Sequence, residues 1–551
     1  MKIDRLGPGR PAENAEQVAV PMRDGVHLAA DLYLPTGAAA PVPAVLVRLP
    51  YDKNGSYCFM EELATHITGR GYAAVIQDVR GKFRSEGETV FAIHEVDDGY
   101  DTVDWVARQD WCDGSVTMWG DSYFGLTQLA AAASGHPSLR AIAPRLTGTQ
   151  LANVVTHAAG TTTVDQTSRR AYFATHFVGR DTYDWPMDFT RRPLADGVEE
   201  FFTELGTRSP SYDLDLKNPA GLGVSIEQLL HARPVPTLFT VGQYDNCAVW
   251  SWADLTALLA DPTWSAELHI RFEAIDHENY RRADVPITSD NDHTQSAAAR
   301  AELIPRILDP ALDFFDHILG RQSASSPPRV AYQVVNDRWH SATQWPPAGS
   351  RAWTLHAVAG DDDRTAVLTE LRPADGGSLR WTSDGVHPVP SIAENPFALM
   401  LATADLSAVA DRNDVVTATS SPVDHDVVLI GEVELTGSLT ATLRSVDLFA
   451  RLLDVSPQGE ATLIARGDLR LHGLDGEQQF RMSLLHVAYR LVAGHRIMLH
   501  LAGSDYPEYT LNPGDGSDPW LAVSIPAVTT TLRLGTTDGL TLHLRTAAAD
   551  D

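Results

Sequence analysis

Residues 118–125 read Met118-Trp119-Gly120-Asp121-Ser122-Tyr123-Phe124-Gly125, between two segments of different composition. The apolar run 115–119 has the composition of a strand, and the Ala-rich run 126–133 that of a helix. A serine at such a sharp strand-to-helix turn has its hydroxyl exposed at the carboxyl end of the sheet, near the positive end of the helix. An ordinary helix-capping serine is the alternative interpretation. The strand-turn-helix setting favours Ser122 as a nucleophile, although Phe124 stands where the second glycine of G-x-S-x-G is expected.

Short apolar runs alternate with segments of helical periodicity over the first 145 residues. A hairpin comes first, because 18–20 and 26–34 flank Asp24-Gly25, a dipeptide suited to a tight turn with positive φ. The later runs are apolar on both faces, as the strands of a helix-covered parallel sheet are. Predicted strands lie at 43–49, 72–77 and 115–119, and predicted helices at 59–70 and 96–108. The alternation predicts an α/β fold with a mainly parallel sheet.

The α/β pattern fades after residue 145 and resumes at residue 234. The interval 146–233 has little strand signal and is rich in aromatic residues, which we interpret as a mostly helical insertion; they include Tyr172, Phe173, Phe177, Tyr183, Trp185 and Phe189. Apolar runs at 236–241 and 267–272 predict two further strands. A helical stretch at 298–319 comes next, which Pro305 and Pro310 should break into pieces.

Beyond the linker 322–328, the chain changes to short β-rich runs separated by Gly, Pro and Asp turns. These runs lie at 329–335, 427–430, 439–443, 448–455, 497–501 and 528–534. Many short strands with regular turns are typical of an antiparallel sandwich. We therefore expect an α/β core formed by 1–145 and 234–322, a helical insertion at 146–233, and a β-sandwich at 323–551.

A base and an acid for Ser122 come after the two strands predicted beyond the insertion. A serine hydroxyl needs a base to take its proton, and the base needs a carboxylate to orient it. Asp245 comes just past the first of these strands, and His277 just past the second. Both should lie at the same sheet edge as Ser122, in the Ser, Asp, His order that serine hydrolases with an α/β sheet use. His293 stays open as an alternative base and Asp276 as an alternative acid.

The composition is that of a globular chain with a strong negative charge. Of 551 residues, 44% are apolar and 21% charged, which argues against wholesale disorder. There are 43 Lys and Arg against 72 Asp and Glu, a net charge of −29 that repels nucleic acid and anionic membrane surfaces. The three cysteines form no CxxC pair, which excludes a disulfide framework and a cysteine zinc site. The N-terminus lacks the apolar core of a signal peptide and no run reaches about 18 apolar residues, so we expect a soluble, cytoplasmic protein.

Several segments resemble one known family. They are VRLPYDK at 47–53, VIQDVRG at 75–81, SEG at 85–87, WCDGSV at 111–116, GDSYFG at 120–125, WP at 345–346, SDYP at 504–507 and NP at 512–513. The sequence is similar to the family of cocaine esterase, α-amino acid ester hydrolases and X-prolyl dipeptidyl peptidases. The family's own G-x-S-Y-x-G turn accounts for the displaced glycine. The resemblance implies an α/β-hydrolase core, a helical cap and a C-terminal jelly-roll domain.

The resemblance also implies roles for individual residues. Ser122 would be the nucleophile, Asp245 the orienting acid and His277 the base, with the backbone N–H of Tyr123 and the phenol of Tyr51 as oxyanion donors. A phenol with a pKa near 10 is a neutral donor at about pH 7, and Tyr51 comes after the strand at the expected sheet edge. Two segments differ from the family pattern: Gln243 replaces a tryptophan before Asp245, and Phe-Glu-Ala-Ile-Asp replaces a Gly-Pro-Trp turn before His277.

The most direct hypothesis is a serine hydrolase that cleaves a small-molecule ester or amide through an acyl-enzyme on Ser122, without a metal or organic cofactor. The same acyl-enzyme would serve an acyltransferase, an aminopeptidase or a β-lactam acylase. Metal-dependent hydrolysis would use Asp276, His277, Glu278 and His293, whose spacing fits none of the common ligand motifs. A non-catalytic binding protein on a hydrolase scaffold is the remaining alternative. A homodimer stays an open interpretation.

Overall fold

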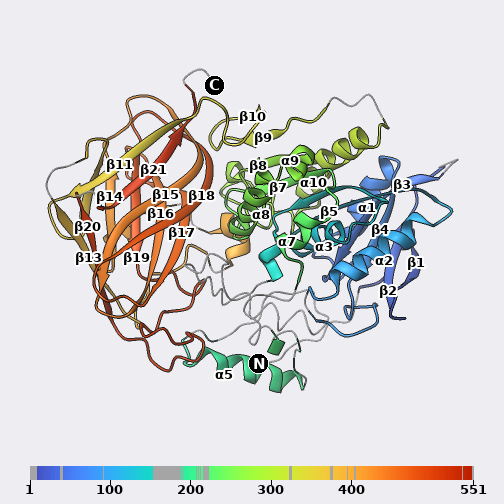
Figure 1. Cartoon of the computed structure of the whole chain (residues 1–551), viewed down its shortest axis with the longest axis horizontal. Helices are drawn as coiled ribbons and strands as arrows, with labels where there is room; N and C mark the ends of the chain where they lie inside the picture. Colours follow the sequence, from blue (N-terminus) through green and yellow to red (C-terminus); the bar gives the residue numbers. More distant parts are fainter. Residues whose placement is uncertain are drawn as a thin grey trace.

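One mixed sheet organises the N-terminal half of the chain (Figure 1). The computed structural model describes residues 9–37, 41–90, 92–152, 188, 190–206, 208, 210, 213–214, 223–321, 326–372, 376–393, 395–402, 405–535 and 538–548. The strands of the sheet are β1 (Glu16–Pro21), β2 (His27–Tyr33), β3 (Val42–Leu49), β4 (Ala73–Asp78), β5 (Cys112–Asp121), β6 (Leu139–Arg145), β7 (Thr237–Gly242), β8 (Leu268–Glu273), β9 (Val330–Gln333) and β10 (Trp339–Ala342). Their order is β1-β2-β4-β3-β5-β6-β7-β8-β9-β10, and every pairing from β4 to β9 is parallel.

Helices cover both faces of this sheet, as the doubly apolar strands predict. In β3, Val45 and Val47 belong to one apolar cluster, whereas Ala44 and Leu46 belong to another on the opposite face. The first cluster includes buried residues of α1 and α10, and the second includes buried residues of α2 and α8. The helices here are α1 (Met60–Gly69), α2 (Glu95–Ala107), α3 (Ser122–Ala133), α8 (Ala248–Ala260), α9 (Pro262–Glu267) and α10 (Ala297–Ile318), with the short turn η2 (Arg282–Asp284).

The predicted α/β elements are confirmed, and β6 is an addition. The hairpin turns at Gly25, whose φ is 87°, and β3, β4, β5, β7 and β8 fall on the five predicted strands. The run 139–145 was not predicted as a strand, because it contains two arginines and a proline, which interrupt an apolar pattern. Of the predicted insertion, residues 153–187, 189, 207, 209, 211–212 and 215–222 lie outside the described residues, and they include the six aromatic residues named above. Its described helices are η1 (Thr149–Ala152), α5 (Leu194–Leu205) and α7 (Ile226–His231).

Helix α10 continues through Pro305 and Pro310, so the predicted break is wrong. Each proline removes one helical hydrogen bond and costs about 3 kcal/mol in a helix interior. Eight buried apolar residues of α10 outweigh this cost, since each fully buried large apolar side chain contributes about 1.5–3 kcal/mol. They are Leu303, Ile304, Ile307, Leu308, Ala311, Leu312, Phe314 and Phe315.

The run 329–335 belongs to the first sheet, so its assignment to the sandwich is wrong. Strand β9 pairs in parallel with β8, with Ile270 opposite Val330 and Phe272 opposite Tyr332. Without this pairing β8 would be an edge strand with a row of unpaired backbone groups. The composition of residues 329–335 predicts a strand but does not say to which of the two sheets the strand belongs. Only its pairing with β8 shows this. The boundaries expected for the four segments stay predictions.

The strands after residue 350 form a β-sandwich around a core of Leu, Val and Ile side chains (Figure 1). They are β11 (Arg351–Ala359), β12 (Thr365–Thr369), β13 (Gly377–Ser383), β14 (Val415–Ser420), β15 (Val427–Ala441), β16 (Ser445–Val455), β17 (Ala461–His472), β18 (Gln478–Leu491), β19 (Arg496–Ala502), β20 (Val528–Leu534) and β21 (Thr541–Thr546). The predicted runs 427–430 and 439–443 are two parts of the long strand β15. The short turns η3 (Pro396–Leu401) and η4 (Ser407–Asp411) also lie here. Among the described helices, none is both long and apolar enough to cross a membrane.

Gln243 joins the loop after β7 to the sandwich. Its side-chain amide donates to the carbonyl of Ile464 (3.2 Å), and its carbonyl oxygen accepts from the amide of Ala488 (3.0 Å). The hydroxyl of the next residue, Tyr244, donates to the carbonyl of Leu463 (3.3 Å). The glutamine that replaces the family's tryptophan therefore connects the two halves of the molecule by buried hydrogen bonds.

Replacing Gln243 with alanine should destabilise the protein. The change leaves two buried backbone groups of the sandwich without this partner, and each unsatisfied buried group costs about 1–3 kcal/mol. We expect the urea denaturation curve to shift to lower urea, by about 2 kcal/mol or more in the free energy of unfolding. Gln344→Ala, at an exposed glutamine, is the matched control. Superimposable curves for the two variants would contradict the structural role given to Gln243.

Candidate active site

The turn between β5 and α3 holds Ser122 in a strained conformation. Ser122 is the first residue of α3 and has a φ of 53°, a left-handed value that is rare for residues other than glycine. Glycines make the turn possible: a Cβ on Gly120 would lie 2.0 Å from a ring carbon of Phe124, and one on Gly125 would lie 2.6 Å from the methyl group of Thr147. The strain brings the Ser122 side chain to the wall of a pocket instead of into the helix.

Ser122, His277 and Tyr51 line the same pocket. They come from the ends of β5, β8 and β3, because the carboxyl ends of parallel strands meet at one sheet edge. Much of the remaining wall is apolar and comes from α1, α10 and the turn around Ser122. Its apolar residues are Phe59, Met60, Leu63, Trp119, Phe124, Leu303 and Ile307.

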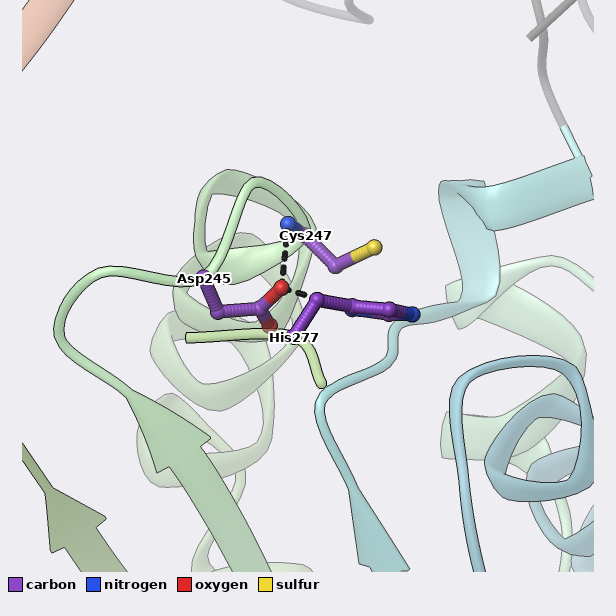
Figure 2. A group of neighbouring side chains, drawn as sticks. All are labelled: Asp245, Cys247 and His277. Carbon is purple, nitrogen blue, oxygen red and sulfur yellow. Dashed lines mark hydrogen bonds and ion pairs between the residues drawn. The ribbon is translucent and has the colours of Figure 1, made fainter. Parts of the chain in front are cut away.

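Asp245 and His277 form a buried pair, drawn in Figure 2. Nδ1 of His277 lies 2.7 Å from Oδ1 of Asp245, and the amide of Cys247 donates to the same oxygen over 2.9 Å. Burial lowers the pKa of His277, but the adjacent Cys247 and Asp245 side chains raise it by more, so that the pKa lies well above its usual value. This environment stabilises a protonated imidazole, which is what a general base becomes when it accepts a proton.

The alternative acid and base occupy other positions. Asp276 is bound by backbone amides, since its two oxygens accept from Tyr280 (3.0 Å) and Met400 (2.9 Å). The ring of His293 lies in the pocket wall against Tyr280 and Phe59, and within the described part of the chain no hydrogen bond or ion pair joins it to Asp245. Burial lowers the pKa of His293 to about 4. The structure thus pairs Asp245 with His277 and not with His293.

The two tyrosines named as oxyanion donors differ in where their side chains lie. The Tyr51 ring is buried in the pocket wall, edge-on to Tyr57 and Phe124. The Tyr123 side chain points elsewhere, because its hydroxyl donates to Oε1 of Glu95 (2.8 Å) and accepts from the amide of Ala92 (3.0 Å). The backbone of Tyr123 nevertheless lies in the first turn of α3, where N–H groups point out of the helix end.

A polar network that sequence analysis missed connects the serine turn to the histidine loop. Asp121 accepts from Nε of Arg145 (2.7 Å) and from the side-chain amide of Asn279 (2.8 Å). Arg145 also donates to the side-chain oxygen of Asn279 (2.7 Å). Asp121 precedes Ser122 and Asn279 lies two residues after His277, so the network fixes the two loops relative to each other. Its only sequence signal is Asp121 within the serine motif.

The sandwich also contacts the histidine loop. The Phe397 ring lies 5.0 Å from the His277 ring between centroids, and the Phe397 carbonyl accepts from the amide of Glu278 (3.1 Å). Glu278 itself lines the pocket and accepts from the hydroxyl of Tyr57 (2.8 Å). Burial raises the pKa of the Glu278 carboxyl. The turn η3 of the sandwich thus supports the loop that carries His277.

The metal-ligand set considered from the sequence does not form a cluster. Among the described His, Cys, Asp and Glu side chains, the group close enough to hold one ion is Asp245, Cys247 and His277, not the set Asp276, His277, Glu278 and His293. Both carboxylate oxygens of Asp276 already accept hydrogen bonds from the backbone amides of Tyr280 and Met400. A metal site built on that second set is therefore not supported by the geometry.

Comparisons with known proteins agree with this fold. Residues 24–277 match the sequence profile of the X-Pro dipeptidyl-peptidase (S15 family), and residues 323–540 match that of the X-Pro dipeptidyl-peptidase C-terminal non-catalytic domain. The chain is 28% identical to cocaine esterase of Rhodococcus sp. (strain MB1 Bresler), over 91% of this chain and 92% of the relative.

Solved structures show the same fold over nearly the whole chain. An aminopeptidase from a marine sediment archaeon, Thaumarchaeota archaeon, superposes with a TM-score of 0.78 at 20% identity, covering 99% of each chain. An α-amino acid ester hydrolase superposes with a TM-score of 0.77 at 21% identity, also covering 99% of each chain.

Fold and site together define an α/β-hydrolase with a C-terminal β-sandwich, an enzyme of the serine hydrolase class that acts on ester or amide bonds. Within that class, the chain belongs to the family of cocaine esterase and the X-Pro dipeptidyl peptidases. The family resemblance seen in the sequence is confirmed.

Proposed function

We propose that the protein hydrolyses small-molecule esters or amides through an acyl-enzyme on Ser122. The observation that carries the proposal is the arrangement of a strained Ser122 and a carboxylate-bound His277 on one pocket. A nucleophile, a base and a group that orients the base are what acyl transfer by serine requires.

In this mechanism His277 takes the proton of Ser122 while Oγ attacks the substrate carbonyl. Asp245 holds the imidazole by its Nδ1–H and stabilises the imidazolium. The Tyr51 phenol and the Tyr123 amide donate to the oxyanion of the tetrahedral intermediate. The imidazolium then gives its proton to the departing alcohol or amine. Water attacks the acyl-enzyme, its proton passes to His277 and on to Ser122, and the carboxylic acid is released.

The apolar wall supports an apolar substituent on the substrate. Seven apolar side chains, besides the rings of Tyr51 and Tyr57, line the pocket that contains Ser122, and burying an apolar substituent there removes apolar surface from water on both partners. Short aliphatic and aromatic esters are therefore the proposed substrate class. A p-nitrophenyl ester with a short acyl chain is a suitable first substrate, because its leaving group is coloured.

Pre-steady-state kinetics with that ester test the proposed function. An acyl-enzyme predicts a burst of p-nitrophenol close to one equivalent per chain, followed by slower turnover, whenever deacylation limits the rate. A chelator should leave the rate unchanged. Absence of turnover on esters and amides, with no labelling by a fluorophosphonate, would favour the non-catalytic binding protein instead.

Tyr51→Phe should give a folded but slow enzyme. The change removes the phenol donor while keeping the buried ring, and losing one oxyanion donor lowers kcat by roughly 10²–10³. Burst and steady-state rates with the same p-nitrophenyl ester measure the effect. Tyr100→Phe, on the surface of α2, is the control and should keep the wild-type kcat. Full kcat in Tyr51→Phe would contradict the oxyanion role of Tyr51.

Two finer features belong to the same proposal. The order of strands in the sandwich around a large apolar core supports a jelly-roll domain. The three cysteines are buried and form no disulfide with one another, which supports a reducing, cytoplasmic location.

A further inference from the structure

A thiol lies beside the acid–base pair of the site. Cys247 is 1% exposed, and its sulfur, an oxygen of Asp245 and a ring nitrogen of His277 all lie within 4.8 Å of one another. Figure 2 shows the sulfur on the same side of the turn as the imidazole. The short turn Asp245-Asn246-Cys247, closed by the Cys247 amide on Oδ1 of Asp245, brings the thiol there.

These three side chains are a ligand set for a thiophilic divalent cation. Zinc takes cysteine sulfur, histidine nitrogen and carboxylate oxygen at bond lengths of about 2.0–2.3 Å, so its ligands lie roughly 3–4 Å apart. The donor atoms here lie within 4.8 Å of one another, which is close to that separation. Cysteines scattered along a sequence give no sign of such a site, because only one of the three ligands is a cysteine.

An independent observation also indicates a ligand here. Oδ2 of Asp245 is buried and has no hydrogen-bond partner among the described residues, while Oδ1 has two. Asp245 is only 4% exposed, and a buried carboxylate oxygen without a partner is costly. A bound cation would satisfy this oxygen directly.

We propose that Asp245, Cys247 and His277 form an inhibitory site for a thiophilic divalent cation such as Zn²⁺ or Cd²⁺. The ion enters through the pocket, which His277 lines. It forms bonds to the thiolate, the carboxylate and one ring nitrogen of the imidazole. The thiol proton is released to solvent, and the ligating nitrogen gives up its proton, so that the single N–H of the neutral ring is on the other nitrogen. The imidazole held by the ion no longer accepts the proton of Ser122, so turnover stops. Only this last step rests on the proposed function.

Cadmium titration tests the site without relying on activity. Cd²⁺ bound to a thiolate gives a charge-transfer absorption in the ultraviolet, and the titration is done on Ser122→Ala protein, which cannot turn over. We expect one Cd²⁺ per chain with this absorption, kept in Cys112→Ala and lost in both Cys247→Ala and Cys247→Ser. Absorption that persists in the Cys247 variants, or that depends on Cys58 of the pocket wall, would overturn the proposal, and so would its absence from the folded Ser122→Ala protein.

Inhibition of ester hydrolysis gives the second readout. Zn²⁺ and Cd²⁺ should inhibit the wild type and Cys112→Ala reversibly, with activity restored by chelator. In Cys247→Ala the half-inhibiting concentration, measured against that variant's own uninhibited rate, should rise by about 100-fold or more, because loss of a direct ligand costs more than the roughly 10–100-fold that loss of an outer-shell partner costs. Cadmium absorption without any hydrolysis would contradict the proposed function and keep the site. Hydrolysis without cadmium absorption would contradict the site and keep the function.

Discussion

Ser122→Ala is expected to abolish hydrolysis of a p-nitrophenyl ester while the protein stays folded. The variant lacks the oxygen that becomes acylated, and removing the nucleophile of a serine hydrolase lowers kcat by roughly 10⁴–10⁶. Alanine should be tolerated structurally, because the hydroxyl faces a pocket and the change leaves Gly120 and Gly125, which the turn requires, in place. Steady-state kinetics together with a urea denaturation curve measure both halves of the expectation.

The control for this prediction is Ser134→Ala at the other end of α3, where the hydroxyl donates to the carbonyl of Ala131 (2.6 Å). That variant should keep kcat within a few-fold of wild type, since typical surface substitutions change stability by about 0.5 kcal/mol or less. A folded Ser122→Ala protein that retains more than about a hundredth of the wild-type kcat would contradict the nucleophile assignment.

His277→Ala is expected to lower kcat almost as far, and His293→Ala is not. Loss of the base from a serine triad costs roughly as much as loss of the nucleophile, because the groups act as a unit. Both histidines line the pocket, but of the two it is His277 that contacts Asp245. We therefore expect a loss of roughly 10⁴-fold or more for His277→Ala, and less than about 10-fold for His293→Ala.

Two measurements separate the histidines. Steady-state kcat measures the whole catalytic cycle, acylation and deacylation together. The rate of fluorophosphonate labelling measures only the attack by Ser122. His277→Ala should be slow in both, whereas His293→Ala should label at a rate close to wild type. The reverse order, with His293→Ala nearly inactive and His277→Ala active, would transfer the role of base to His293.

The three residues of the site that directly follow predicted strands could be predicted from the sequence. Ser122, Asp245 and His277 each come just after a run that the sequence predicts as a strand, and the carboxyl ends of parallel strands lie at one edge of the sheet. The structure brings Asp245 and His277 into contact despite the unusual segments before them. The end of a strand can be located from a few neighbouring residues, and these can be read from a single sequence.

The supporting contacts could not be predicted, because they join residues far apart in the chain. Arg145 and Asn279 are separated by 134 residues and meet only through the sheet order β6-β7-β8. Phe397 reaches His277 from another region of the chain, and no spacing rule connects the two. Helix α10 shows the same limit, since burial against the sheet overrides the local effect of Pro305 and Pro310.

Mass spectrometry of the protein after reaction with a fluorophosphonate is the most direct measurement. Digestion and peptide mapping should place a single phosphonyl group on the residue that stands between Asp121 and Tyr123, and Ser122→Ala should carry none. An adduct on a different residue of a folded, hydrolytically active chain would contradict the role of Ser122 as nucleophile, and so would activity that survives complete modification of Ser122.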